Sequence, residues 1–180
     1  LGIAITELEN NALGWGKIAK DGAGFKAEGF SAFATSAQGV ATTSPTKVQL
    51  DGEEYDSSSR FDLSNDRFTP QLKGAYEVTG CVGFFTSASA AQGADLRLYK
   101  NGVLHSVLAK YGKLDAGCGY GLSGVAQVEM NGSSDYLELF VVPTTASLMN
   151  LGQLFSSDDN ASIATYKATR FAAKLLGRTT

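Results

Sequence analysis

The chain has 180 residues, of which 43% are hydrophobic and 18% are charged, and its formal net charge is −3. This composition is typical of one globular domain, and the 15 Lys and Arg residues are too scattered to form the basic surface of a nucleic-acid-binding protein. No apolar run approaches the roughly 18 residues of a transmembrane helix, so the sequence also predicts no membrane insertion.

Residues 1–28 differ from the remainder and are predicted to be a connector that docks the domain formed by residues 29–180. Thr6 and Glu9 have the spacing of a capping box, which favours a short helix near the start of this connector. Trp15 is the single tryptophan, and we expect it to pack against the base of the domain. Because the chain begins at Leu1 without a methionine, we expect processing or further sequence upstream.

From residue 29 onward the sequence has short alternating segments separated by Gly, Asn, Asp and Ser. The strongest strand signal spans 75–85, where Tyr76, Val78, Val82 and Phe84 share one face. The expected strands are 29–34, 48–50, 60–63, 67–69, 75–85, 96–100, 103–105, 125–130, 136–142, 163–166 and 170–176. About ten short strands and no helical period predict an all-β fold, a two-sheet antiparallel jelly-roll sandwich.

Glycine-containing segments between these strands are interpreted as turns. Asn101–Gly102 is predicted to be a tight hairpin turn. Residues 121–124 are likewise predicted to be a turn, and residues 109–120 a long glycine-rich loop.

One segment, residues 48–80, carries a more specific pattern. It has an aromatic–Asp pair before a loop, a Phe-Thr-Pro step, and a Gly-x-Tyr entry into the long strand. The residues concerned are Tyr55, Asp56, Phe68, Thr69, Pro70, Gly74 and Tyr76. The pattern resembles the signature of the complement component 1q and tumour necrosis factor family of jelly-roll domains. The resemblance continues in order from Phe30 to Leu176.

The resemblance implies a tight homotrimer in which one sheet of each subunit faces a threefold axis. The sequence agrees, because Val78 and Val82 alternate with Cys81 and Phe85, so both faces of this strand are apolar. A second copy of the chain is the simplest partner for the surplus face, although loops or the N-terminal segment are alternatives. The candidate trimer-interface residues are Phe85, Tyr136, Phe140, Val142 and Phe171.

Catalytic and metal-binding residues are scarce. His105 is the single histidine, and no nucleophile-elbow motif accompanies it. The acidic segments 62–66 and 158–160 lack the spacing of a calcium loop and are predicted to be solvated turns. Cys81 and Cys118 are predicted to be small buried residues. We therefore expect a protein that is not an enzyme and holds no cofactor or metal.

Ligand recognition is expected on loops at the end of the domain away from the connector. The candidate residues are Tyr111, Tyr120, Asp158 and Asp159. Tyrosine rings at such positions can stack on sugars, and packing at a trimer seam is the alternative.

Three functions remain open from the sequence. The favoured hypothesis is a structural protein of a bacteriophage virion, such as a head or tail fibre tip or a capsid decoration protein. It would bind other virion proteins through residues 1–28 and a host receptor or glycan through its loops. The alternatives are a secreted complement-like head and a trimer on a bacterial or spore surface, either of which would bind proteins or glycans.

Overall fold

The computed structural model describes residues 28–40, 43–86, 92–115, 117–144, 149–151 and 167–179. These residues form strands and turns and contain no helix, so none of them forms a segment able to cross a membrane as a helix. The predicted connector up to residue 27, the strand predicted at 163–166, and Asp158 and Asp159 lie outside the described residues.

Thirteen strands are present in the described part of the chain. They are β1 (Gly29–Phe33), β2 (Gln38–Val40), β3 (Thr46–Lys47), β4 (Gly52–Asp56), β5 (Phe61–Asp62), β6 (Arg67–Phe68), β7 (Gly74–Thr86), β8 (Gln92–Lys100), β9 (Val103–Leu114), β10 (Gly119–Met130), β11 (Leu137–Pro143), β12 (Met149–Leu151) and β13 (Arg170–Arg178). The sequence missed β2, β3, β4 and β12, which are too short to show clear alternation. Residues 48–50, predicted to be a strand, instead lie outside any strand, just after β3.

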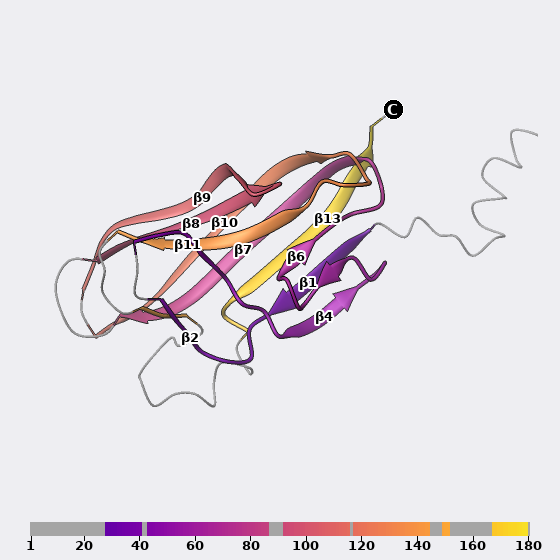
Figure 1. Cartoon of the computed structure of the whole chain (residues 1–180). Coiled ribbons are helices and arrows are strands. Elements are labelled where there is room, and N and C mark those ends of the chain that lie inside the picture. Colours follow the sequence, from indigo (N-terminus) through magenta and orange to yellow (C-terminus); the bar gives the residue numbers. More distant parts are fainter. Residues whose placement is uncertain are drawn as a thin grey trace, which may run out of the picture.

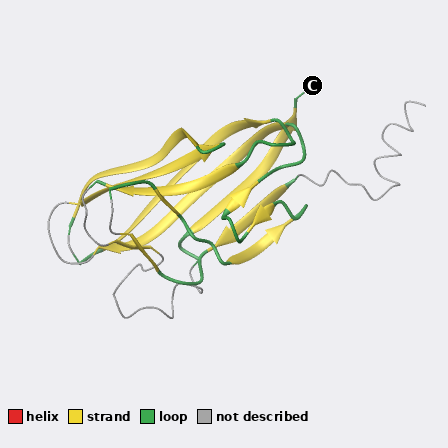
Figure 2. Ribbon diagram, viewed as in Figure 1, coloured by secondary structure: helices red, strands yellow, loops and turns green. Residues whose placement is uncertain are grey.

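The strands form two antiparallel sheets that face each other (Figures 1 and 2). Sheet A has the order β2-β12-β7-β13-β1-β4, with β10 paired to β7. Sheet B has the order β5-β6-β11-β8-β9, with β3 paired to β11. This arrangement confirms the predicted two-sheet jelly-roll sandwich.

The core lies between the sheets. The inward side chains predicted on the long strand, Tyr76, Val78, Val82 and Phe84, are all fully buried. A second part of the core is a cluster of aromatic rings around Phe30, whose centroid lies 4.6 Å from that of Phe61, 4.5 Å from that of Phe68 and 5.1 Å from that of Phe171. Stacked and edge-on rings at such distances stabilise a core beyond their buried area.

Phe171 belongs to this core, so its prediction as a trimer-interface residue is wrong. Its exposed fraction is 0%, and it pairs with Gly80 on β7, which places it on the inner face of β13. A side chain enclosed by its own subunit has no surface to offer a second one.

Other residues of the 48–80 pattern have structural roles. The Asp56 carboxylate accepts hydrogen bonds from the backbone N–H groups of Ser58, Arg60 and Phe61, which fixes the turn after β4. The Tyr76 hydroxyl donates to the Glu28 carboxylate and lies 2.9 Å from the Leu72 carbonyl oxygen, which ties the residue before β1 to the entry of β7. Asp56 and Tyr76 therefore stabilise the fold.

Two turn predictions have opposite outcomes. Asn101 and Gly102 have φ values of 54° and 76°, as a tight two-residue hairpin requires, which confirms that turn. Residues 121–124 instead lie inside β10, so the turn predicted there is wrong. The predicted loop 109–120 is also mostly strand, because β9 continues to Leu114 and β10 begins at Gly119.

The prediction that both cysteines are buried is wrong for Cys118, which is exposed in the turn between β9 and β10. Cys81 is half-buried on the outer face of β7, and neither cysteine forms a disulfide.

Candidate functional site

The outer face of sheet B is charged, and its charges are paired. The buried Glu138 carboxylate lies 2.6 Å from Lys47 Nζ and 2.9 Å from Arg67 Nη2. On the neighbouring strand, Asp95 accepts a 2.7 Å hydrogen bond from Arg97. Covering this face with another protein would desolvate these ions without offering them better partners.

Three predicted trimer-interface residues lie on this charged face. The guanidinium of Arg67 lies 3.9 Å from the ring centroid of Tyr136, and the ring of Phe140 packs 4.4 Å from that of Tyr99. Val142 pairs with Asp95 and is buried. Tyr136 and Phe140 are half-buried against groups of their own subunit and Val142 is buried, so little of their apolar surface is exposed.

The outer face of sheet A has a different character. Its centre is made of small uncharged residues: Thr79 and Cys81 on β7 lie opposite Val125 and Ser123 on β10, and Ala172 on β13 lies on the other side of Thr79. Phe85, the remaining predicted interface residue, is half-exposed on this face near the end of β7. These residues are uncharged, but charged residues border them on the same face, because Arg170 lies opposite Cys81 and Lys174 lies opposite Glu77.

β9 and β10 are the outermost strands of the two sheets on one side of the sandwich, and they contact each other. Five of the eight large apolar side chains that are exposed in the described residues lie on these two strands. Four of them form a surface that we call the β9/β10 edge, namely Val103, Leu104, Val107 and Val125, whereas Tyr111 lies further along β9, toward the turn before β10. Val103 and Val125 have exposed fractions of 69% and 59%. An apolar, unpaired strand edge of this kind is a surface for association.

The opposite side of the molecule is acidic. There sheet A ends at β4, where Glu53 and Glu54 are exposed. Glu54 forms ion pairs with Lys167 at 3.2 Å and with Arg170 at 2.9 Å. Charged side chains on an edge strand oppose pairing with another chain, so of these two edges the β9/β10 edge is better suited to contact.

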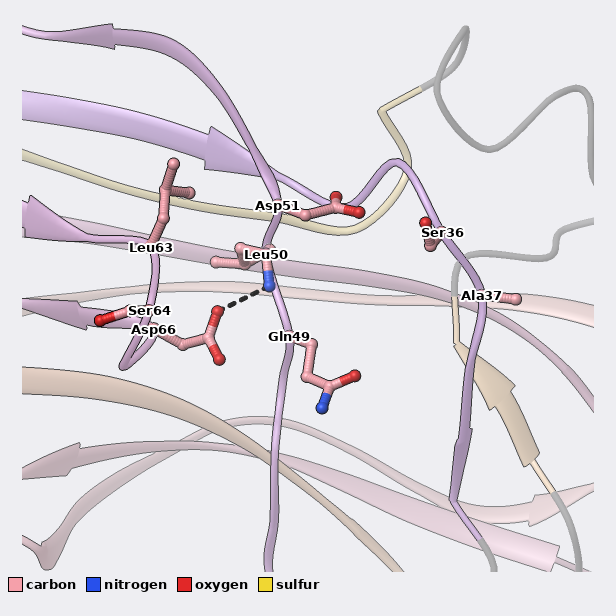
Figure 3. Close-up of a pocket in the computed structure, with 8 residues that line it drawn as sticks. All are labelled: Ser36, Ala37, Gln49, Leu50, Asp51, Leu63, Ser64 and Asp66. Carbon is pink, nitrogen blue, oxygen red and sulfur yellow. Dashed lines mark hydrogen bonds between the residues drawn. The ribbon is translucent and has the colours of Figure 1, made fainter.

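A polar hollow of about 280 Å³ lies beside the turn between β5 and β6 (Figure 3). It is lined by Ser36, Ala37, Gln49, Leu50, Asp51, Leu63, Ser64 and Asp66. Asp51 accepts hydrogen bonds from the backbone N–H and hydroxyl of Thr35, and Asp66 accepts a 2.7 Å bond from Leu50 N–H. These carboxylates fasten the chain segments that form the hollow.

The pKa values of the two carboxyl groups in the hollow are shifted in opposite directions. Burial raises the pKa of Asp66, against the hydrogen bond from Leu50, and the negative charge of Asp51 adds to the rise. Burial also acts to raise the pKa of Asp51, but its hydrogen bonds from Thr35 outweigh burial and lower that pKa. Within the described ranges no three His, Cys, Asp or Glu residues are grouped to hold a metal ion.

Tyr111 and Tyr120, predicted as ligand-binding residues, are brought together by the hairpin of β9 and β10. Their ring centroids lie 6.0 Å apart. His105 is exposed on β9. Leu104, Val107 and Val125 were not predicted from the sequence as interface residues. The apolar residues Val103, Leu104 and Val107, which follow the Asn101–Gly102 turn, were a visible signal for the last two of them.

No protein-family model matches the sequence, and no curated protein matches it. Solved structures do match. The globular domain of zebrafish complement 1qA aligns with a TM-score of 0.53 and 13% identity, covering 84% of this chain and 99% of that one. Murine APRIL aligns with a TM-score of 0.54 and 11% identity, covering 84% of this chain and 100% of that one.

The chain has the complement 1q and tumour necrosis factor type of jelly-roll fold. The likeness spans both sheets and confirms the fold that the 48–80 pattern implied. At this identity it concerns the fold alone, and the function is argued from the surfaces described above.

Proposed function

We propose that this chain is a non-enzymatic binding domain that forms a trimer through the β9/β10 edge. The observation that carries the proposal is the concentration of exposed apolar side chains on that edge. Three copies related by a threefold axis must make heterologous contacts, in which one surface of a subunit meets a different surface of the next. The centre of the outer face of sheet A, with Thr79, Cys81 and Ala172, is the complementary surface.

Charge supports this pairing of surfaces. Insertion of Val103, Leu104 and Val107 against Thr79 and Ala172 would bury apolar area, and the ion pairs Arg170–Glu54 and Lys174–Glu77 would lie at the border of the contact. The same insertion against sheet B would cover Glu138 and Asp95 with their cationic partners, which is unfavourable. The contact therefore involves sheet A and leaves sheet B facing solvent.

The oligomeric mass in solution tests the proposal. Light scattering of the purified chain is expected to give about 57 kDa, three times the 18.9 kDa of one chain. Val107→Glu places a charge on the β9/β10 edge and is expected to give monomers. Leu63→Glu is the matched control, because Leu63 is exposed but lies in the turn between β5 and β6. A wild-type monomer would contradict the proposal.

For the biological setting we propose a bacteriophage virion, with the trimer acting as a fibre tip or capsid decoration protein. Support comes from the polar loops, from a sequence with only two cysteines, and from residues 1–28 as a segment suited to attachment on other virion proteins. A secreted complement-like head and a bacterial or spore surface trimer are the alternatives. Immunogold labelling of purified particles distinguishes the virion from both.

A further inference from the structure

Aromatic rings connect the core to the surface at the turn between β9 and β10. Phe84 is fully buried, and the ring of Tyr120 is stacked on it with 6.0 Å between centroids and 29° between planes. The ring of Tyr111 follows at 6.0 Å from Tyr120, tilted by 57°. Tyr111 has an exposed fraction of 41%, so the last ring of this series is open to solvent.

The residues between β9, which carries Tyr111, and β10, which carries Tyr120, are hydrogen-bonded to Thr86, which is itself fully buried. The Thr86 hydroxyl donates to the Asp115 carbonyl at 2.7 Å, and its backbone N–H donates to the Cys118 carbonyl at 3.0 Å. The Thr86 carbonyl accepts from Gly117 N–H at 2.8 Å. Asp115 N–H in turn donates to the Tyr120 hydroxyl at 2.7 Å. Because these hydrogen bonds hold Asp115, Gly117 and Cys118 in place without a ligand, binding beside them requires little further ordering.

The surroundings of the two tyrosines are open. A Cβ built at Gly112, Gly117 or Gly121 would have no heavy atom within 4 Å. These glycines flank both tyrosines along the chain, so no side chain at those positions obstructs a flat ligand. The exposed ring of Tyr111, set beside the fixed Tyr120 ring and bordered by backbone peptide groups, suits a ligand with one apolar face and a polar rim.

The position of this turn in the molecule also suits binding. It lies at the end of the sandwich opposite the beginning of β1 and the end of β13 (Figure 1). A domain anchored through the chain that precedes Gly29 would therefore direct the turn away from its attachment.

We propose that Tyr111 and Tyr120 form a platform for a neutral saccharide, with the exposed ring of Tyr111 taking the apolar face of a pyranose. The C–H bonds of that face carry partial positive charge and are attracted to the negative face of an aromatic ring, while hydroxyls around the sugar bond to exposed backbone and to the tyrosine hydroxyl. The inference rests on the proposed function, since it names the ligand class of that binding domain. The chain's net charge of −3 and scattered cations do not favour a polyanion as the ligand.

Saturation-transfer NMR on the full chain tests the platform. The probes are pentasaccharides of glucose, galactose, mannose and N-acetylglucosamine, each used separately. At least one is expected to receive saturation on its ring C–H protons. Tyr111→Ala is expected to weaken its binding about tenfold, whereas Tyr111→Phe, which keeps the ring, should retain most of it.

Tyr55→Ala is the matched control, because Tyr55 is also an exposed tyrosine and lies on β4, the edge strand of sheet A far from β10. It should leave binding unchanged. The proposal is overturned if no probe receives saturation, or if the signal survives Tyr111→Ala.

Light scattering on the same samples separates this inference from the trimer. Lost binding with the trimer mass retained supports the platform. Dissociation of the trimer by Tyr111→Ala would instead place Tyr111 in a subunit seam and overturn the platform. A wild-type monomer that binds a probe through Tyr111 would overturn the trimer and leave the platform supported.

Discussion

Gly124 of β10 lies directly against Leu108 of β9, at the point where the edges of the two sheets meet. A Cβ built on Gly124 would lie 2.2 Å from the Leu108 carbonyl oxygen, far inside van der Waals contact. The Leu108 side chain in turn packs on the core. The absence of a side chain at residue 124 therefore allows the sandwich to close on this side.

Replacing Gly124 tests this closure. We expect Gly124→Ala to lower the free energy of unfolding by about 1–3 kcal/mol, because backbone rather than a flexible side chain must move to admit the methyl group. Urea unfolding followed by circular dichroism measures the change. Gly112→Ala on β9 is the control, since nothing lies within 4 Å of its Cβ position. Equal effects of the two variants would contradict the role of Gly124.

The hydrogen bond between Tyr76 and Glu28 supports a second prediction. The Glu28 carboxylate is buried and also accepts hydrogen bonds from the backbone N–H groups of Gln71 and Leu72. Tyr76→Phe removes one donor from this buried acceptor, which is expected to destabilise the fold by about 1–3 kcal/mol. Thermal unfolding measures the loss, and Tyr55→Phe, at an exposed tyrosine, should change stability little. If Tyr76→Phe left the stability unchanged, the hydrogen bond between Tyr76 and Glu28 would make no net contribution to it.

The turn between β5 and β6 gives a pH-dependent prediction. Hydrogen bonds from Asn65 and Ser64 lower the pKa of Asp62 from 3.8 to about 2. Since the folded pKa is depressed, these bonds stabilise the turn fully above pH 3.8, and their contribution is lost as the pH falls through about 2.

An NMR titration of the carboxyl carbons measures this directly. We expect Asp62 to titrate near pH 2 and Asp66, whose pKa is raised chiefly by burial, to titrate above 3.8. Coincident midpoints would be incompatible with the structure. In Asp62→Asn the acid-dependent loss of order in this turn should disappear.

The two cysteines are expected to differ in reactivity. Cys118 is exposed, whereas burial raises the pKa of the Cys81 thiol, and the positive charge of Arg170 offsets that rise only in part. Because the thiolate is the reactive form, a disulfide reagent such as DTNB at pH 8 should modify Cys118 about tenfold faster than Cys81 or more. Cys118→Ser should abolish the fast phase alone. If Cys81→Ser abolished it instead, the burial of Cys81 would be disproved.

The sequence predicts well the features that are local. The two-residue period places Tyr76, Val78, Val82 and Phe84 on one face, and the structure buries all four. The same period could have placed Phe171 in the core, because it shares a face of β13 with Ala173 and Leu175 while Arg170 and Lys174 lie on the other face. The sequence predicts poorly what depends on contacts between distant elements, such as the contact between β9 and β10 at the side of the sandwich.

Glycine explains the misplaced turn at 121–124. Glycine marks turns, but it also occurs within strands where another backbone approaches closely. Gly124 is of the second kind, because its neighbour is the carbonyl of Leu108. The apolar edge was likewise only partly predictable, since Val107 and Val125 form one surface only after two sheets meet.

β1 begins and β13 ends at the same end of the sandwich (Figure 1). Proteins fused before β1 or after β13 would therefore both lie at this one end of the sandwich. The opposite end of the sandwich, where β9 turns into β10, would remain accessible. The domain could therefore be joined to a surface or carrier before β1 and after β13 and still expose that end.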